Sequence, residues 1–155
     1  MEASLSSKNV CKSHHCVSCC YGTEMLLLEA DVHRIVGLGF KEGSFAVESD
    51  GFKMLRNGSS GRCVFHDGKQ CTIYSNRPSG CKLYPIIFDE DLDHPVKDGL
   101  CPYRDEFDFS LKAKRELSGV YPKLIEERRR RHVGASLRAI TSFEDDSTIG
   151  TDQEL

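Results

Sequence analysis

Eight cysteines are the residues of this sequence most able to do chemistry, and they are not evenly spread. All of them lie in the first 101 of the 155 residues, and four fall within ten residues. The eight are Cys11, Cys16, Cys19, Cys20, Cys63, Cys71, Cys81 and Cys101. Thiolates are soft, charged donors that bind zinc or the iron of iron–sulfur clusters. The grouping therefore predicts a metal centre, with all eight as candidate ligands.

The adjacent pair Cys19 and Cys20 is the most informative detail of the spacing. Neighbouring side chains of an extended segment point to opposite sides, so one tetrahedral ion rarely takes both. Either the two thiolates serve two metals, or one is a ligand and the other packs. Eight cysteines satisfy two four-thiolate zinc sites, or one four-cysteine cluster with four left for a second centre, redox work or packing. The spacing leaves these arrangements open.

Other side chains could replace a thiolate or act beside the metal. His14 and His15 lie in the first cysteine loop, and His66 lies close to Cys63. Because thiolates are plentiful, we expect these histidines to be exposed polar residues rather than ligands. Acid–base catalysis beside a metal would need a carboxylate, and loop acids are ordinarily solvated. The available loop acids are Asp67, Asp89, Glu90 and Asp91.

Composition indicates how the thiols are used. Cysteine makes up about 5% of the chain, below the roughly 8–10% of small disulfide-rich domains. The first residues lack the apolar core of a secretory signal, and no apolar run approaches the roughly 20 residues of a membrane span. We therefore expect a cytoplasmic protein without membrane attachment, in which the thiols stay reduced.

Charge is unevenly distributed, although the net charge is only −3. Residues 111–140 carry nine basic and three acidic side chains, whereas residues 141–155 carry five acidic and no basic ones. The run from Arg128 to Arg131 could be a nucleic-acid patch, but no aromatic residue interleaves with it and an acidic segment follows. We expect the solvated end of a helix instead.

Short elements must position the cysteines. Val32, Ile35 and Val36 recur at helical spacing between an acidic start and Gly37, which predicts a helix. The pattern of residues 45–56 predicts one or two strands. The pattern of residues 63–74 predicts a β-hairpin, in which Gly68 supplies the positive φ that the turn needs. We expect a turn or one helical turn over residues 77–81, a strand over residues 86–88 and a polar loop over residues 89–99. From about residue 108 the pattern is helical, with Pro122 predicting a kink or two pieces.

These elements predict the α+β class: a small irregular cysteine-rich metal-binding domain with a short antiparallel hairpin, an N-terminal helix and a C-terminal helix. We divide the chain into a disordered N-terminus (1–10), the cysteine-cluster domain with its C-terminal helix (11–140), and a disordered acidic tail (141–155). Bound metal is expected to replace part of the hydrophobic core.

The motifs around the cysteines resemble those of the CxxCxxCC, or YkgJ-like, cysteine-cluster family, described as zinc- or iron-chelating domains. The most specific motif is Arg77-Pro78-Ser79-Gly80-Cys81-Lys82-Leu83-Tyr84-Pro85, which is similar to the family pattern RPxxCxxYP. Further likeness lies in residues 16–20, 28–32, 61–65, 71–74 and 101–102. One departure is that Cys11 lies five residues before Cys16, while the family often has a closer spacing, which would fall on Ser13.

The resemblance implies a metal-binding domain over about residues 11–103. A similar domain occurs in a flagellin lysine methylase with an iron–sulfur cluster, but this chain has no glycine-rich nucleotide loop, so methyl transfer is not implied. We expect Arg77 to bind carbonyls or offset thiolate charge, Tyr84 to pack at the rim of the centre, and Pro78 and Pro85 to stiffen the turns that present Cys81.

Three function hypotheses follow. The first, which we favour, is a small cytosolic metalloprotein that binds an iron–sulfur cluster, such as 4Fe-4S, through its cysteines and serves redox transfer or assists a partner enzyme. The second is a zinc-stabilised interaction module without catalysis, whose C-terminal helix docks a protein partner. The third is a metal-dependent enzyme of unknown substrate.

Overall fold

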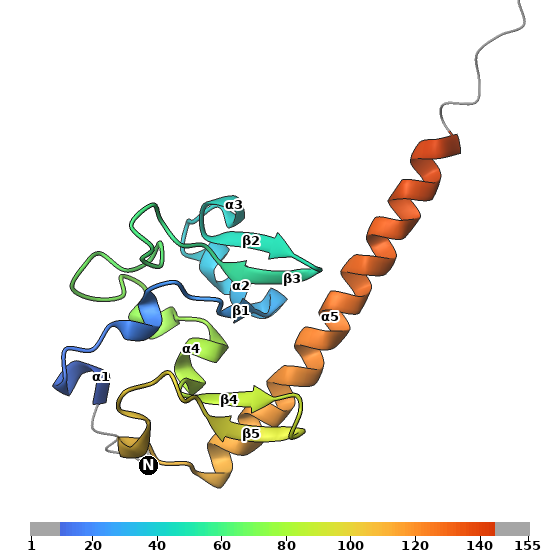
Figure 1. The fold of residues 1–155 in the computed structure, drawn as a ribbon. Coiled ribbons are helices and arrows are strands. Elements are labelled where there is room, and N and C mark those ends of the chain that lie inside the picture. Colours follow the sequence, from blue (N-terminus) through green and yellow to red (C-terminus); the bar gives the residue numbers. More distant parts are fainter. Residues whose placement is uncertain (1–9, 145–155) are drawn as a thin grey trace, which may run out of the picture.

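The structure, a computed structural model that describes residues 10–144, contains two small antiparallel sheets, several short helical pieces and one long C-terminal helix (Figure 1). This mixture confirms the predicted α+β class. The disorder predicted for residues 1–9 and 145–155 lies outside the described residues. Val10, which we placed in the N-terminal segment, is buried and begins the first helix. No helix of the described part is long and apolar enough to cross a membrane.

The N-terminal half carries three of the first four cysteines on short helical pieces and the fourth, Cys16, in the loop between them. Helix α1 (Val10–Ser13) carries Cys11, and the 3-10 turn η1 (Ser18–Cys20) carries Cys19 and Cys20. Strand β1 (Leu26–Leu27) precedes helix α2 (Glu29–Gly37), which confirms the helix predicted from periodicity. Helix α3 (Glu42–Phe45) follows, and then strands β2 (Ala46–Ser49) and β3 (Phe52–Leu55), so the one or two strands predicted in residues 45–56 are two. These strands form an antiparallel sheet in the order β1-β3-β2.

The second half begins with the short pieces η2 (Tyr74–Asn76) and α4 (Ser79–Leu83), the predicted single helical turn that carries Cys81. Strand β4 (Ile86–Asp89) confirms the strand predicted there and pairs with β5 (His94–Lys97). The prediction of an unstructured polar loop over residues 89–99 was therefore wrong. Pairing with β4 makes a strand of residues whose own composition does not favour one. The piece η3 (Arg104–Glu106) then leads to helix α5 (Leu111–Glu144).

The hairpin predicted over residues 63–74 does not form as a ladder. In the described residues this segment has isolated bridges only, between His66 and Cys71 and between Cys63 and Asn57. Gly68 does adopt the expected positive φ, at 103°. The two sides of the turn are still bonded to each other, because the Thr72 N–H donates to the Phe65 carbonyl at 2.7 Å. Phe65 and Ile73 of the segment are buried in the core cluster, so burial of these two side chains also helps to fix its path.

Helix α5 is one continuous helix of 34 residues that passes through Pro122, so of the two predicted alternatives, a kink or two pieces, the division into two pieces does not occur. The Tyr121 ring stacks on the Phe88 ring of β4 with centroids 4.1 Å apart, and Leu117 and Leu124 are buried. These contacts lie on both sides of Pro122 and hold the helix where the proline removes a backbone hydrogen bond. The helix also includes residues 141–144, which we assigned to the tail.

The arginine run fastens α5 to the turn between β2 and β3. Arg128 pairs with the Asp50 carboxylate, and Arg131 donates to the Gly51 carbonyl at 2.7 Å and to Glu29. The Arg131 side chain is only 14% exposed. The expectation of a solvated helix end therefore holds only for the other two arginines, which are exposed and pair with Glu126.

Glu29 makes the attachment of α5 sensitive to acid. Burial raises the pKa of Glu29, but hydrogen bonds and positive charge from Arg131 and Lys53 outweigh it and hold that pKa below its usual value. A carboxyl with a lowered pKa contributes stability above its unfolded pKa of about 4.3, and this contribution is lost as the pH falls through the folded pKa. We expect Glu29→Gln to lower the free energy of unfolding by about 1 kcal/mol at pH 7 and to reduce the further loss at acid pH.

Urea unfolding at pH 7 and pH 3 measures both effects. The matched control is Glu48→Gln, at an exposed position of β2, which should change stability little at either pH. If the Glu29 variant loses as much stability on acidification as the parent protein, the ion pairs with Arg131 and Lys53 do not contribute as described.

Candidate metal centre

All eight cysteines are free thiols, and they divide into two sets of four. Cys11, Cys16, Cys19 and Cys101 line one cavity of about 430 Å³, and we call them the cavity set. Cys20, Cys63, Cys71 and Cys81 belong to the hydrophobic core cluster or pack against it, and we call them the core set. The division falls between the adjacent residues Cys19 and Cys20, whose side chains hydrogen bond to each other, so the two sets adjoin at this pair.

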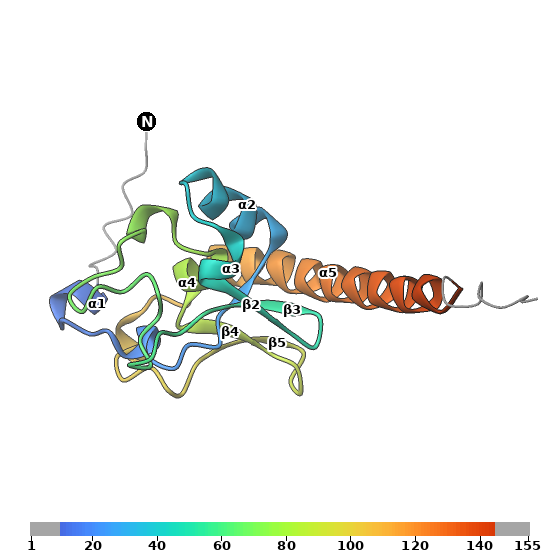
Figure 2. The same cartoon turned by 90° about the horizontal axis from the view of Figure 1, so that it is seen from above.

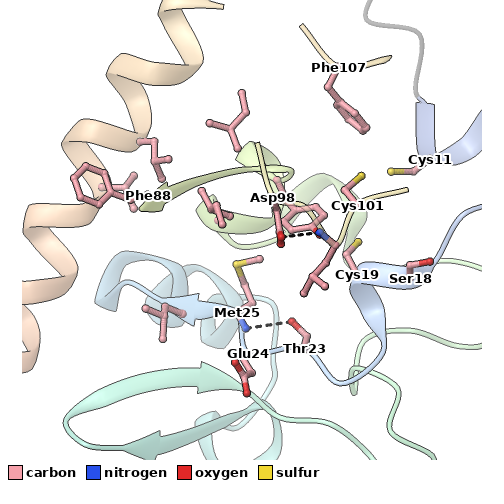
Figure 3. Close-up of a pocket in the computed structure, with 18 of the residues that line it drawn as sticks. Cys11, Ser18, Cys19, Thr23, Glu24, Met25, Phe88, Asp98, Cys101 and Phe107 are labelled. Atoms are coloured by element: carbon pink, nitrogen blue, oxygen red, sulfur yellow. Dashed lines mark hydrogen bonds between the residues drawn. The ribbon is translucent and has the colours of Figure 1, made fainter. Parts of the chain in front are cut away.

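Local backbone bonds position the cavity set. The Cys16 N–H donates to the Cys11 carbonyl at 2.8 Å, which brings these two residues together despite their longer spacing. The Cys101 N–H donates to the Asp98 carbonyl at 3.2 Å, at the end of the loop that follows β5. Figure 3 shows the sulfur atoms of Cys11, Cys19 and Cys101 close to one another at one end of the cavity.

Contacts between distant segments position the core set. The Cys63 N–H donates to the Cys20 carbonyl at 2.7 Å, and Cys71 bridges to His66, whose N–H donates to the Cys63 carbonyl. Cys81 lies on α4, which begins directly after the fully buried Pro78. Pro85, on the other side of α4, is also fully buried, and the stiffening of these turns by the two prolines stays a prediction.

Three of the sulfur atoms share one backbone hydrogen-bond pattern. The N–H groups of Phe65, Ile73 and Tyr103 donate to the sulfur two residues earlier, which belongs to Cys63, Cys71 and Cys101 respectively. Donors of this kind stabilise a thiolate and tune the centre that it binds. The same local geometry thus recurs at three cysteines in both sets.

Most of these thiols are neutral until a cation binds. Burial, followed by the charge of neighbouring thiolates, raises the pKa of Cys11 to about 11 and that of Cys81 to about 12. Cys19 differs, because the hydrogen bond from Cys20 outweighs burial and, with the charge of Arg77, lowers the pKa of Cys19 to about 7. Coordination to a metal deprotonates thiols, so binding must release protons.

The donor chemistry of the two sets fits zinc or an iron–sulfur cluster, since each set offers four thiols. Within residues 10–144, no group of three or more histidine, cysteine or carboxylate side chains is already arranged to hold a metal ion. The positive charge of Arg77 also acts on Cys71 and Cys81, where it offsets only part of the increase in pKa that burial causes. Arg77 also donates to the Tyr74 carbonyl at 2.8 Å. Both expected roles of Arg77 are therefore present.

Asp31 supports the core set, and we had interpreted it only as an acid at the start of a helix. It is 1% exposed. Its Oδ1 accepts hydrogen bonds from the N–H and hydroxyl of Ser79 at 3.1 and 2.8 Å and from Arg34 at 2.8 Å, and its Oδ2 accepts one from the Leu28 N–H. Ser79 begins α4, so Asp31 ties α2 to the helix of Cys81. The available sequence signal was an acid four residues before the apolar Ile35, on the buried face.

His14 and His15 lie on the surface, as expected. The His14 ring stacks on Tyr103 with centroids 3.9 Å apart and its Nε2 lies 2.8 Å from Glu106. His14 therefore links the first cysteine loop to the segment after Cys101 without being placed as a ligand.

His66 differs from the expected exposed polar residue, because it is only 6% exposed. Its Nδ1 accepts the Gly68 N–H at 3.1 Å, so the proton of the neutral ring lies on Nε2. A protonated Nε2 has no lone pair for a metal, which excludes His66 as a ligand in this arrangement. Among the described residues, this Nε2 has no hydrogen-bond acceptor.

We expect His66→Gln to leave the metal content per chain unchanged, because the thiols remain. Elemental analysis of the purified variant measures this, with Cys71→Ser, at the residue bridged to His66, as the matched comparison that should lose metal. A His66 variant with one metal fewer per chain would show that the imidazole ring flips and coordinates the metal.

Of the four candidate acids, only Glu90 lines the cavity. Asp67 accepts the N–H groups of Gln70 and Lys69, which lower its pKa, and Asp89 accepts the Leu92 N–H. Asp91 is exposed. Glu90 lines the cavity and accepts the Tyr121 hydroxyl at 2.7 Å, while Tyr84 lines the same cavity. Acids from the loop after β4 thus reach the cavity only through Glu90.

Residues 10–102, which include all eight cysteines, match the family model CxxCxxCC, described as a "putative zinc- or iron-chelating domain". The chain belongs to this family. No curated protein and no solved structure matches it. Membership confirms the resemblance stated from the motifs and supports metal chelation by this CxxCxxCC domain, for either zinc or iron. Helix α5 lies outside the matched residues.

Proposed function

We propose that this CxxCxxCC domain binds an iron–sulfur cluster through the cavity set and a structural metal ion through the core set. In this proposal it is a cytoplasmic protein that serves redox transfer or assists a partner enzyme. The observation that carries the proposal is the division of eight free thiols into one set at an open cavity and one set in the core.

The environment of each set favours this assignment. Cys19 is exposed and the cavity beside it offers more room than a single ion needs, which suits a cluster that exchanges electrons with a partner. Cys63 is buried and the other members of the core set pack against apolar side chains. Closed four-thiolate sites of that kind are structural zinc sites.

A bound cluster would supply one-electron chemistry, and the side chains of this chain would set its environment. The Tyr103 N–H donates to the Cys101 sulfur, and the positive charge of Arg77 acts on Cys19. Both favour the charged form of a thiolate. Tyr84 and Asp98, which hydrogen bond to each other, border the same space.

A zinc-stabilised interaction module is the second candidate, and the course of α5 favours it. In two views the C-terminal part of α5 extends away from both sheets (Figures 1 and 2). Val133 and Ile140 of this part are exposed. An exposed apolar residue pair on a projecting helix suits a protein partner.

Elemental analysis of anaerobically purified protein, with a visible absorption spectrum, tests the proposal. We expect a brown protein with about four iron, about four acid-labile sulfide and about one zinc per chain. A colourless protein with two zinc ions and no sulfide would reject the cluster and favour the interaction module.

A further inference from the structure

The cavity continues well beyond the cavity set. Figure 3 shows Cys11, Cys19 and Cys101 at one end, Phe88 beside helix α5 at the other, and Met25 and Asp98 between them. The volume of about 430 Å³ falls within the roughly 300–1,000 Å³ of small-molecule sites. A metal centre held by the four thiols occupies only their end, which leaves the space toward α5 for another occupant.

The walls of that space are apolar and its charges have one sign. Met25, Phe88, Tyr121 and Leu124 form the part near α5. Every charged side chain that lines the cavity in the described structure is acidic, and no lysine, arginine or histidine lines it. Thiolates at the other end add further negative charge. This combination disfavours an anion and favours a cation with an apolar body.

Asp98 is the carboxylate best placed to hold a cation. Asp31 is committed to its helix contacts, Glu90 accepts the Tyr121 hydroxyl, and Glu24 is exposed at the edge. Asp98 lies in the middle of the cavity and accepts the Leu100 N–H at 2.9 Å and the Tyr84 hydroxyl. A carboxylate has about four acceptor sites, so Asp98 retains acceptor capacity.

We propose that the cavity binds a small organic amine with an apolar body, and that Asp98 is the counter-ion of its ammonium group. The ammonium donates a charge-assisted hydrogen bond to Asp98, and the apolar body fills the space between Met25, Phe88 and Leu124. Asp98 is close to Cys101, so the amine lies beside the metal centre. Only the position of the amine beside a metal centre rests on the proposed function. The apolar walls of the cavity and Asp98 are the same whichever metal binds.

Tryptamine is a suitable probe, because the chain contains no tryptophan and indole fluorescence reports on the ligand alone. Equilibrium dialysis against the full-length protein, with its metal as purified, gives the affinity. The comparison ligands are indole-3-propionic acid and 3-ethylindole. The first has the same indole ring with a carboxylate on its side chain, and the second is neutral. We expect tryptamine to bind at least about tenfold more tightly than either.

Two variants test separately the charge of Asp98 and the apolar space near α5. Asp98→Asn should weaken tryptamine about tenfold and leave 3-ethylindole nearly unchanged. Leu124→Phe should weaken both ligands by filling the space near α5, whereas Leu111→Phe, at an exposed position of the same helix outside the cavity, should weaken neither. Metal content and thermal unfolding show whether each variant is folded.

Equal affinity for the amine and the carboxylate, absence of tryptamine binding, or an Asp98→Asn variant of unchanged affinity would each overturn the proposal. Its failure is distinguishable from failure of the proposed function. Protein that holds two zinc ions and still selects tryptamine through Asp98 would retain the amine site and reject the cluster.

Discussion

The Cys63→Ser substitution is expected to remove a bound metal and to unfold the protein. The Cys11→Ser substitution is expected to remove a bound metal and to leave the domain folded. Cys63 is buried in the core cluster, while Cys11 lies in short helix α1 at the cavity. Structural zinc contributes about 10–16 kcal/mol in small peptides, and a whole domain is stable by only about 5–15 kcal/mol. Loss of the proposed core centre would therefore remove about as much stability as the domain has.

Elemental analysis and circular dichroism of both variants measure this difference. The Cys11 variant should lose iron and sulfide and keep its zinc and its secondary structure. Chelation of zinc from the unmodified protein should reproduce the unfolding seen for Cys63→Ser. If either substitution removes all metal from a protein that stays folded, the eight thiols serve one centre and the division into two sets is wrong.

The Asp31→Ala substitution is expected to lower the free energy of unfolding by about 2–3 kcal/mol, the cost of leaving buried hydrogen-bond donors without their charged acceptor. Asp31 is 1% exposed and accepts hydrogen bonds from Ser79, Arg34 and Leu28. Its removal leaves these donors without their acceptor and frees the start of α4. Because α4 carries Cys81, metal affinity should also fall about 10–100-fold, as for other residues that orient ligands.

Urea unfolding of metal-loaded protein and competition with a chelator measure the two effects. Asp91→Ala, at an exposed loop carboxyl, is the matched control and should change stability by no more than about 0.5 kcal/mol. An Asp31 variant that loses stability but keeps full metal affinity would show that α4 is held in place by other contacts, such as the buried Pro78.

Local patterns predicted the elements whose residues depend mainly on their neighbours in sequence. Apolar spacing at Val32 and Ile35 marked α2, and the run at Ile86 marked β4. Patterns failed where a distant segment supplies the partner. Strand β5 exists because β4 pairs with it, and residues 63–74 follow the burial of Phe65 and Ile73 rather than a ladder. Helix α5 passes through Pro122 because β4 and the buried core hold it on both sides.

The sequence by itself determined the donor chemistry of this protein: eight thiols, their loop spacing, and a family motif around Cys81. Only the tertiary structure decided how those thiols divide, because Cys19 and Cys20 are neighbours in the chain and yet join different sets. The partners of each come from segments far along the chain, and burial against them is a property of the folded molecule that spacing does not contain. The role of Asp31 and the acidic cavity beside Cys101 arise for the same reason.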